Sequence, residues 1–581
     1  MKTLGKSIIA AAAGAAMAIS TPAFARDAAG EWSGLLGAGE ISLRIVLHIE
    51  RGPDGALTGT LDSPDQGATG IPLGEISDSG DGRLSVTVPA VGGTYSAVWN
   101  ESEQRWDGMW NQGAGPKIPL NLSAGPPQPV LPEKWDMPSN DQIAALIADR
   151  IAPREGQGVV VGVLGPEGSR EVSGGPDGGA PFDGRSMFEI GSISKVFTAL
   201  ILADMANKGQ VSLDDPAEKY LPAGHTMPQR GGRKITLRDL STHMSGLPRL
   251  PDNMPFTDPD DPYADYTEEL MLAFLDGYAL PRDVGSQHEY SNLSVGLLGY
   301  LLGRAAGMDY ATLLRQRITG PLGMDDTMID LPPSHADRLV PSYDMYMRPA
   351  KPWRLPALVG AGAIRSTADD MMTFAAAALD ESSPIAAAMK TTLSVREKTE
   401  DARIEQALGW QIFHPVPNRS IVAHGGGTGG FRSQLTLEPV LERAVVVLTN
   451  SAAEPSAGDI ATHVLAGSPV VPTPPVPPAP PPVEVRKEVT LSVAELDRVV
   501  GRYEFAPGVI FNLTREGTTL RAQREGSAVG PILPIFAEAP LSFFWKAVNA
   551  QVSFTADDSG KIVGAVFTQD GQSMTGRPLE P

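Results

Sequence analysis

One segment of the chain brings a candidate nucleophile, a candidate base and the start of a helix together: Phe188-Glu189-Ile190-Gly191-Ser192-Ile193-Ser194-Lys195-Val196-Phe197-Thr198-Ala199. The pattern predicts a helix from Ser192 to Asn207, with Gly209 soon after it as a stop signal. Residues three apart share one face of a helix, so we expect the amine of Lys195 within reach of the Ser192 hydroxyl. A serine needs an adjacent base to become a good nucleophile, and burial lowers the pKa of a lysine toward that role. The S-x-x-K pattern alone is common by chance, so it needs support from elsewhere in the chain.

A second motif, Tyr290-Ser291-Asn292, lies about 100 residues further on. A tyrosine can pass a proton when nearby lysines lower its pKa, and an asparagine amide can hold a substrate carbonyl or the lysine. The structural alternative is a tyrosine packed beside a helix, with Ser291 or Asn292 as the helix cap. The pattern predicts that helix from Val295 to Ala306, ended by Gly307.

A third motif is rich in glycine: His424-Gly425-Gly426-Gly427-Thr428-Gly429-Gly430-Phe431. Glycines let a strand edge approach a substrate closely, and backbone N–H groups there can form half of an oxyanion hole. A competing interpretation is the HGGG oxyanion loop of α/β-hydrolases, but that fold needs a G-x-S-x-G elbow, which this sequence lacks. A phosphate-binding P-loop is excluded because no G-K-[ST] follows.

Taken together, the motifs occur in the order S-x-x-K, Y-x-N, H-x-G, separated by about 100 and about 130 residues. In this order and spacing the chain resembles the serine β-lactamase and penicillin-binding family. The similarity is to its class C-like branch, which includes class C β-lactamases, D-Ala-D-Ala carboxypeptidases, D-aminopeptidases and related esterases. Three smaller signatures agree with this resemblance, and they lie at residues 235–248, 321–327 and 366–370.

The resemblance covers roughly residues 136–467 and implies an α+β domain, an antiparallel sheet flanked by helices. Residues 27–125 and 488–581 contain short strand-like runs separated by turn signals, which predict a small all-β domain at each end. These flanks resemble β-barrel or lipocalin-like modules. Residues 468–487 are dominated by proline and predict an extended linker of polyproline II type.

The resemblance also implies catalytic roles. Ser192 would attack a carbonyl carbon and become acylated. Lys195 and Tyr290 would share the role of general base and then protonate the leaving group. The backbone N–H groups of Ser192 and Gly427 would bind the oxyanion.

Asn292, His424 and Gly426 would bind the substrate. His424 stands where many β-lactamases have the lysine of K-T-G, and this departure matters for the substrate. A lysine provides a fixed positive charge for a substrate carboxylate, whereas a histidine is mostly neutral at pH 7. A histidine at this position also occurs in carboxypeptidase, aminopeptidase and esterase members of the family. We therefore rank a peptidase or esterase above an efficient β-lactamase.

Composition excludes several other classes of function. The net charge of −21 argues against nucleic acid and anionic membrane surfaces as partners, because like charges repel. The absence of cysteine removes disulfides, thiolate metal sites and cysteine nucleophiles. His225, His288 and His335 show no metal-binding spacing, so we expect neither a metal nor an organic cofactor.

The N-terminus predicts a cleavable signal peptide, residues 1–25. Lys2 and Lys6 precede an apolar run over residues 8–19, and Ala23-Phe24-Ala25 fits a cleavage site. The run is shorter than the roughly 20 residues that span a bilayer. We therefore expect a periplasmic or secreted protein without an integral membrane segment after cleavage.

Some further residues invite a functional role but favour a structural one. Trp99, Trp106 and Trp110 could bind a sugar, yet core aromatics are the more common case. His243 is predicted to be a structural hydrogen-bonding residue. The pairs Asp214-Asp215 and Asp369-Asp370 could form a carboxylate dyad, but each lies where a helix could begin.

The leading hypothesis is a hydrolase that forms an acyl-enzyme on a peptide amide, including amides of D-amino acids, or on an ester. The alternative within enzymes is a β-lactamase. The alternative of another class is a non-catalytic penicillin-binding sensor or a cell-wall-binding protein. Retention of Ser192, Lys195, Tyr290 and Asn292 argues against the last, because a pure binding protein needs no proton-transfer pair.

Overall fold

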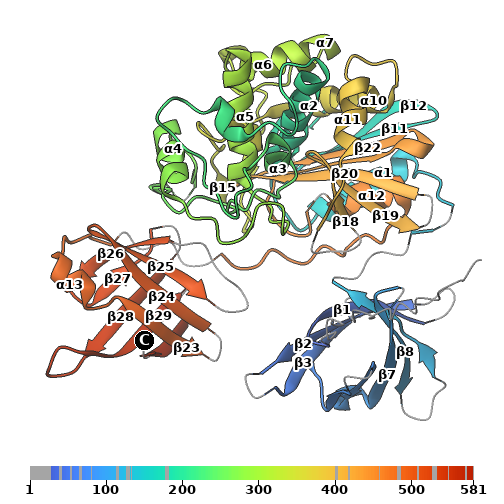
Figure 1. The fold of residues 1–581 in the computed structure, drawn as a ribbon. Helices are drawn as coiled ribbons and strands as arrows, with labels where there is room; N and C mark the ends of the chain where they lie inside the picture. Colours follow the sequence, from blue (N-terminus) through green and yellow to red (C-terminus); the bar gives the residue numbers. More distant parts are fainter. Residues whose placement is uncertain are drawn as a thin grey trace, which may run out of the picture. The chain divides into compact units, whose positions relative to one another are not determined.

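The computed structural model describes most of the chain between residues 28 and 579 (Figure 1). The predicted signal peptide lies outside the described residues. The chain divides into two units, Met1–Gln128 and Pro129–Pro581. None of the helices within the described part is long and apolar enough to cross a membrane. The gaps in the description fall at residues 38–41, 53–54, 64–67, 80–81, 102, 113–116, 126–130, 133, 177–181, 259, 400–403, 417–418, 457, 480–485, 507–508, 526–532, 547–548 and 570–571.

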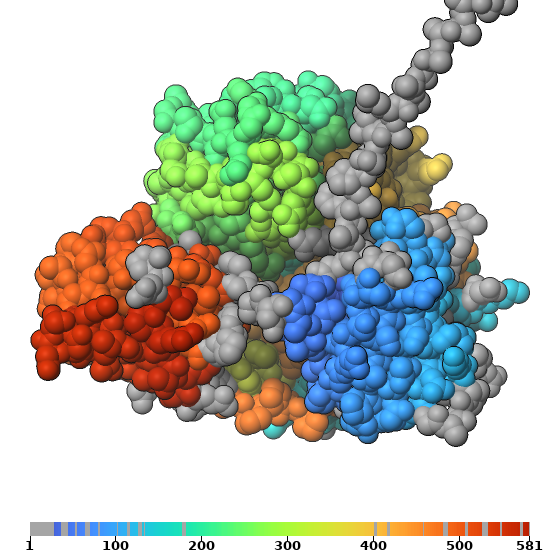
Figure 2. Space-filling model, turned by 60° about the horizontal axis from the view of Figure 1, so that its bottom comes forward, coloured from blue at the N-terminus to red at the C-terminus, as the bar shows by residue number. Residues whose placement is uncertain are grey.

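The first unit is a ten-stranded antiparallel sheet that forms a half-barrel, with the order β4-β3-β2-β1-β10-β8-β7-β6-β5 and β9 beside β8. Its residues are coloured blue in the space-filling view of Figure 2. Trp106 and Trp110 are buried in its core, which confirms the structural interpretation for these two residues. Trp99 is half-buried and packs edge-on against Trp106 at 5.2 Å between ring centroids. The strands are β1 (Gly30–Gly37), β2 (Ser42–Arg51), β3 (Leu57–Ser63), β4 (Ala68–Pro72), β5 (Ile76–Asp78), β6 (Arg83–Val88), β7 (Gly93–Asn100), β8 (Arg105–Gln112), β9 (Ile118–Pro119) and β10 (Leu122–Ala124).

The second unit contains an eight-stranded antiparallel sheet in the order β12-β11-β22-β21-β20-β19-β18-β17. This sheet and the helices around it confirm the expected α+β fold class. Two short pairs, β13 with β16 and β14 with β15, stand apart from it. The strands are β11 (Val159–Gly165), β12 (Gly168–Gly174), β13 (Met187–Glu189), β14 (Ser342–Tyr343), β15 (Pro349–Ala350), β16 (Arg365–Thr367), β17 (Glu397–Lys398), β18 (Ile404–Gln406), β19 (Gln411–Val416), β20 (Arg419–Gly427), β21 (Arg432–Glu438) and β22 (Arg443–Thr449).

Helices cover both faces of this sheet (Figure 1). In β22, Val445 and Val447 pack with α1 and α12 on one face, whereas Val446 and Leu448 belong to the larger core on the other. Because side chains on both faces of β22 are buried, the sequence of this strand is a continuous apolar run. The helices are α1 (Asn140–Ile151), α2 (Ser194–Asn207), α3 (Leu237–Ser241), α4 (Glu268–Gly277), α5 (Asn292–Ala306), α6 (Tyr310–Leu314), α7 (Gly320–Leu322), α8 (Pro333–Ala336), α9 (Val359–Gly362), α10 (Ala368–Leu379), α11 (Ala386–Ser394) and α12 (Gly458–Ala466).

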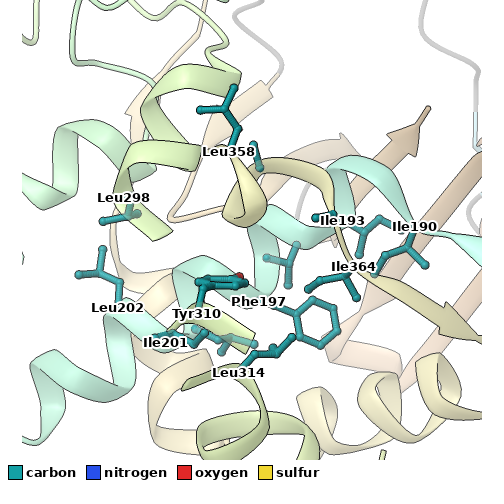
Figure 3. Packing of buried hydrophobic residues seen from close by; sticks show 14 of the residues in the cluster. Ile190, Ile193, Phe197, Ile201, Leu202, Leu298, Tyr310, Leu314, Leu358 and Ile364 are labelled. Carbon is teal, nitrogen blue, oxygen red and sulfur yellow. The ribbon is translucent and has the colours of Figure 1, made fainter. Parts of the chain in front are cut away.

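Helix α2 lies in the middle of the larger core. Figure 3 shows Phe197 and Ile201 of this helix among side chains from α5, α6 and the loop before β16. A helix that is apolar on all sides is expected to be buried, and α2 is. The structure corrects its start: Ser192 lies in a 3-10 turn, η3 (Gly191–Ile193), and the α-helix begins at Ser194.

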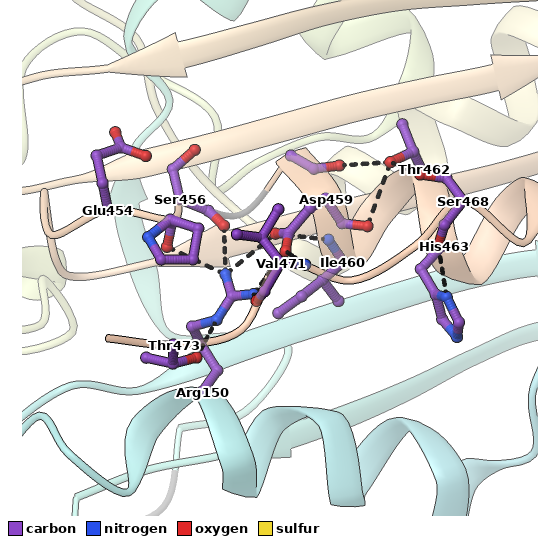
Figure 4. A network of polar contacts seen from close by, with 12 residues as sticks. Arg150, Glu454, Ser456, Asp459, Ile460, Thr462, His463, Ser468, Val471 and Thr473 are labelled. Atoms are coloured by element: carbon purple, nitrogen blue, oxygen red, sulfur yellow. Dashed lines mark hydrogen bonds and ion pairs between the residues drawn. The ribbon is translucent and has the colours of Figure 1, made fainter. Parts of the chain in front are cut away.

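The start of the proline-rich linker is bound to the surface of the central domain. Arg150 of α1 forms a 2.6 Å ion pair with Asp459 of α12 and donates hydrogen bonds to Val471 and Thr473 (Figure 4). Arg150 is 2% exposed, so its charge is compensated almost entirely by these partners. The first residues of the linker are therefore anchored rather than free.

The chain ends in a closed eight-stranded barrel, which confirms the barrel-like C-terminal flank. A short helix, α13 (Val493–Asp497), precedes it and begins with a capping box at Ser492. Aromatic rings of Phe505, Phe511 and Phe567 pack together in its core. The strands are β23 (Gly501–Ala506), β24 (Val509–Glu516), β25 (Thr519–Glu525), β26 (Leu533–Ala539), β27 (Ser542–Phe544), β28 (Ala550–Ala556), β29 (Ile562–Gln569) and β30 (Gln572–Pro578).

Candidate active site

The hydroxyl of Ser192 and the amine of Lys195 lie within hydrogen-bond distance. Lys195 Nζ is 2.9 Å from Ser192 Oγ and donates a 2.7 Å hydrogen bond to the carbonyl of Ala361 in α9. Lys195 is completely buried, whereas Ser192 is partly exposed. Burial, reinforced by the positive charge of Arg249, holds the pKa of Lys195 well below its ordinary value. A neutral amine with a free lone pair can accept the serine proton.

Three glycines allow strand β20 to approach the nucleophile. Gly191 has a φ of +49°, and a Cβ atom on it would lie 2.6 Å from the backbone nitrogen of Gly427. A Cβ atom on Gly426 would lie 2.0 Å from the carbonyl oxygen of Ile190. Both distances are shorter than real Cβ contacts, so only glycine fits. The backbone of Gly427 consequently lies beside Gly191, the residue that precedes Ser192. Gly427 itself is exposed to solvent.

Tyr290 belongs to the same group of residues. Lys195 Nζ lies 4.9 Å from the centroid of its ring, and Ser192 is near enough to act on the pKa of its hydroxyl. Burial raises the pKa of Tyr290 to about 12, although Ser192 and Arg249 act in the opposite direction. The condition for easy proton transfer, a nearby lysine that lowers this pKa, is not met. Tyr290 therefore keeps its proton at neutral pH.

The Y-x-N motif also caps a helix, as the structural alternative predicted. Ser291 is the N-cap of α5, and its Oγ accepts a 2.9 Å hydrogen bond from the N–H of Ser294. The helix therefore starts at Asn292, three residues before the predicted start. Asn292 donates through Nδ2 to the hydroxyl of Tyr263 at 3.0 Å. Its buried Oδ1 has no hydrogen-bond partner among the described residues.

His424 lies on β20, and burial lowers its pKa to about 4. Its Nδ1 is 2.6 Å from the carbonyl oxygen of Gly425. Because a carbonyl can only accept, Nδ1 carries the proton and Nε2 is left as an acceptor. The histidine is neutral at pH 7, as the sequence predicts, so it supplies no positive charge to the site.

His243 is confirmed as a structural hydrogen-bonding residue. Its Nδ1 accepts a 3.1 Å hydrogen bond from the N–H of Ser291, and its ring packs 4.6 Å from the ring of Tyr290. Burial holds the pKa of His243 well below its ordinary value, so the ring stays neutral. His243 thus fixes the position of the tyrosine without carrying charge.

The motif search missed two residues near the nucleophile. Arg249 directly follows the 235–248 signature, and its Cζ lies 5.2 Å from the centroid of the Tyr290 ring. Glu189, three residues before Ser192, is buried and accepts hydrogen bonds from Arg365 and from the N–H of Trp353. Burial raises the pKa of Glu189. The sequence offered one signal for each residue, its place beside a motif: Arg249 follows the 235–248 signature, and Glu189 precedes the S-x-x-K motif.

The remaining candidates lie elsewhere. His225 pairs with Asp276, and His335 pairs with Asp326. Asp369 and Asp370 occupy the first turn of α10, as predicted, whereas no helix starts at Asp214-Asp215. The described residues contain no group of three His, Cys, Asp or Glu side chains that could hold a metal ion.

Comparison with known proteins agrees with this geometry. A family model for β-lactamase matches residues 143–467. D-alanyl-D-alanine-carboxypeptidase/endopeptidase AmpH from Escherichia coli (strain K12) is 33% identical over 282 residues, 46% of this chain and 71% of that protein. Penicillin-binding protein 4* from Bacillus subtilis (strain 168) is 26% identical over 418 residues, 67% of this chain and 87% of that protein. A β-lactamase from Pseudomonas fluorescens is 27% identical over 312 residues, 47% of this chain and 82% of that protein.

Proposed function

The chain belongs to the β-lactamase family of serine hydrolases, and on this basis we propose that it is an exported enzyme that cleaves a peptide amide or an ester through an acyl-enzyme on Ser192. The observation that carries the proposal is the completely buried amine of Lys195, 2.9 Å from Ser192 Oγ, with a depressed pKa. A purely structural lysine has no reason to be held neutral against a serine hydroxyl.

The groups divide the proton transfers between them. Ser192 Oγ attacks the carbonyl carbon as its proton moves to Lys195 Nζ. Because the pKa of Tyr290 is raised to about 12, its hydroxyl acts as a proton donor to the leaving group and regains a proton from Lys195. Water then attacks the acyl-enzyme, and the same groups return the serine hydroxyl. This assignment divides the shared role expected from the sequence into a base, Lys195, and an acid, Tyr290.

The oxyanion of each tetrahedral intermediate would be bound by the N–H groups of Ser192 and Gly427. The close approach of β20 to η3, which Gly426 and Gly191 make possible, supports this assignment. Such donors act strongly because they are fixed before charge develops. The free Oδ1 of Asn292 would accept an N–H of the substrate.

A peptide ranks above a β-lactam as substrate. His424 is neutral, so it cannot replace the lysine charge that holds the carboxylate of a β-lactam in many β-lactamases. The 33% identical relative is named a D-alanyl-D-alanine carboxypeptidase/endopeptidase, which supports a peptide that contains D-amino acids. Export is supported by the signal-like residues 1–25. Sequencing of the mature N-terminus should begin at Arg26.

Labelling with a fluorescent fluorophosphonate or penicillin, followed by peptide mass mapping, tests the proposal. We expect Ser192 to carry the label in the wild type and the label to be lost in Ser192→Ala. The exposed Ser382 provides a control, since Ser382→Ala should label normally. Failure of both reagents to modify Ser192 in folded protein would overturn the catalytic proposal in favour of a binding protein.

Substrate class needs a second assay. Nitrocefin, a D-Ala-D-Ala peptide, a D-alanine anilide and a p-nitrophenyl ester should be compared side by side. We expect the peptide or the ester to have the highest kcat/KM. Fast nitrocefin hydrolysis with inert peptides would reverse the ranking and identify a β-lactamase.

A further inference from the structure

The amine of Lys195 is oriented by a main-chain carbonyl of helix α9. Lys195 Nζ donates a 2.7 Å hydrogen bond to the carbonyl oxygen of Ala361 and lies 2.9 Å from Ser192 Oγ. A neutral amine has one lone pair, and a carbonyl oxygen can only accept a hydrogen bond, so the lone pair cannot point toward Ala361. The position of this carbonyl therefore decides whether the lone pair of Lys195 can face Ser192.

Helix α9 cannot hold that carbonyl in place by itself. It consists of the four residues Val359–Gly362, and helices this short depend on contacts with the rest of the protein. A Cβ atom on Gly360 would lie 3.0 Å from the Cα of Gly299 in α5 and 3.0 Å from the Oγ1 of Thr198 in α2. The main chain of α9 thus packs directly against α2 and α5, and these helices determine where its carbonyls lie.

Thr198 binds the carbonyl that directly precedes the one of Ala361. Its Oγ1 donates a 2.7 Å hydrogen bond to the carbonyl oxygen of Gly360 and lies 3.2 Å from the carbonyl oxygen of Ser194. A hydroxyl has one proton, and the shorter contact is the one to Gly360. Lys195 and Thr198 are three residues apart, on one face of α2. They consequently bind two successive carbonyls of α9.

Tyr310, the first residue of α6, fixes the orientation of the Thr198 hydroxyl. The two hydroxyl oxygens lie 2.6 Å apart, and both side chains are buried. Burial raises the pKa of Tyr310, so the phenol keeps its proton. Because the proton of Thr198 is directed to Gly360, the tyrosine donates and the threonine accepts. Figure 3 shows the ring of Tyr310 among apolar side chains of the core, which hold it in place.

We propose that Thr198 and Tyr310 are positioning residues for the acylation of Ser192: they hold α9 so that its carbonyl turns the lone pair of Lys195 toward the nucleophile. This inference rests on the proposed function and adds to it two residues that act only through Lys195. The alternative is that both hydroxyls merely stabilise the core. In that case the rate of acylation should follow the stability of each variant.

Two replacements of Thr198 separate these alternatives. Thr198→Val keeps the shape of the side chain and removes the hydroxyl, whereas Thr198→Ser keeps the hydroxyl and removes a buried methyl group. The readouts, on the full chain, are thermal melts and the second-order rate constant for labelling of Ser192 by a fluorophosphonate. We expect Thr198→Val to lower this constant by about 10- to 100-fold, because small misplacements of a catalytic group cost rates of this order. Thr198→Ser should react close to the wild-type rate even though it melts earlier.

Two further variants complete the test. Tyr310→Phe keeps the ring and frees the Thr198 hydroxyl to turn toward Ser194, so it should slow labelling by less than Thr198→Val does. Thr373→Val is the matched control. Thr373 is an exposed threonine of α10 that donates a 3.0 Å hydrogen bond to the carbonyl four residues earlier, as Thr198 can, and its replacement should leave the rate unchanged.

A wild-type labelling rate for Thr198→Val would overturn the inference, as would rates for the valine and serine variants that both follow their melting temperatures. If Thr198→Val does not fold, a wild-type rate for Tyr310→Phe overturns it instead. These outcomes leave the proposed function standing as long as Ser192 is labelled in the wild type and not in Lys195→Met. Absence of label in the wild type, or full labelling of Lys195→Met, would reject the proposed function together with the inference.

Discussion

Replacing Lys195 by methionine should stabilise the protein at neutral pH while it abolishes acylation. The wild-type lysine is completely buried, and burial holds its pKa well below the ordinary 10.5. Folding therefore favours the loss of a proton that the unfolded chain retains at pH 7. Methionine keeps the apolar stem in place and needs no such proton release.

The size of the effect follows from proton linkage. Each unit by which burial lowers the pKa of Lys195 below 10.5, down to the pH of the measurement, costs about 1.4 kcal/mol of stability. The variant loses the hydrogen bonds from Nζ to Ser192 and Ala361 and leaves a buried carbonyl unpaired, which costs about 2.5 kcal/mol. The net expectation is a gain in the free energy of unfolding at pH 7, because a lowering by about two pKa units already offsets the lost hydrogen bonds.

The pH dependence identifies the cause. Below pH 10.5 the unfolded lysine is protonated and the native one is not, so wild-type stability is lost as pH falls, until the native pKa is reached. The advantage of Lys195→Met should therefore grow as pH falls and shrink as pH rises toward 10.5, the pKa of the unfolded lysine. At higher pH the wild type should be the more stable protein.

Calorimetric melts from pH 6 to pH 9 can measure this difference in the transition of the central domain, which has the largest enthalpy because of its size. Lys390→Met, at an exposed position of α11, is the control and should change stability by less than about 0.5 kcal/mol at every pH. A stability difference for Lys195→Met that does not vary with pH would refute the claim that Lys195 is neutral in the native state.

Three further predictions test other parts of the site and fold. Tyr290→Phe keeps the ring and removes the proton donor, so acylation rates in stopped-flow burst assays should fall by about 10²- to 10⁴-fold; a smaller loss would reject the acid role. Gly426→Ala places a Cβ atom against a backbone oxygen and should abolish labelling of the nucleophile, whereas Gly277→Ala, at a position with open space around it, should label normally. Arg150→Ala leaves Asp459 unpaired and should lower stability by about 3 kcal/mol in urea melts, and a double replacement by Met and Leu at these positions should recover most of the loss.

The sequence alone was sufficient for much of the site. Ser192 and Lys195 are three residues apart on a predicted helix start, so their contact follows from local geometry. The fold class followed from the order of three motifs, although Tyr290 and His424 lie far from Ser192 along the chain. The exact helix start did not follow, because the 3-10 turn at Ser192 depends on Gly191 packing against a distant strand.

The tertiary structure decided which groups of the site carry a charge. Whether Lys195 is a cation or a base, and whether Tyr290 gains or loses its proton, depends on burial by residues far apart in the sequence. The pKa of Tyr290 shows this most clearly, since burial raises it although the charge of Arg249 acts in the opposite direction. Arg249 belongs to none of the motifs, and its position at the site depends on the hydrogen bonds between its main chain and α5.

The sequence determined which groups are present and their order, because spacing is a local property. Only the folded packing determined which of these groups carry charge, because solvation and electrostatic fields depend on the whole surroundings of each group.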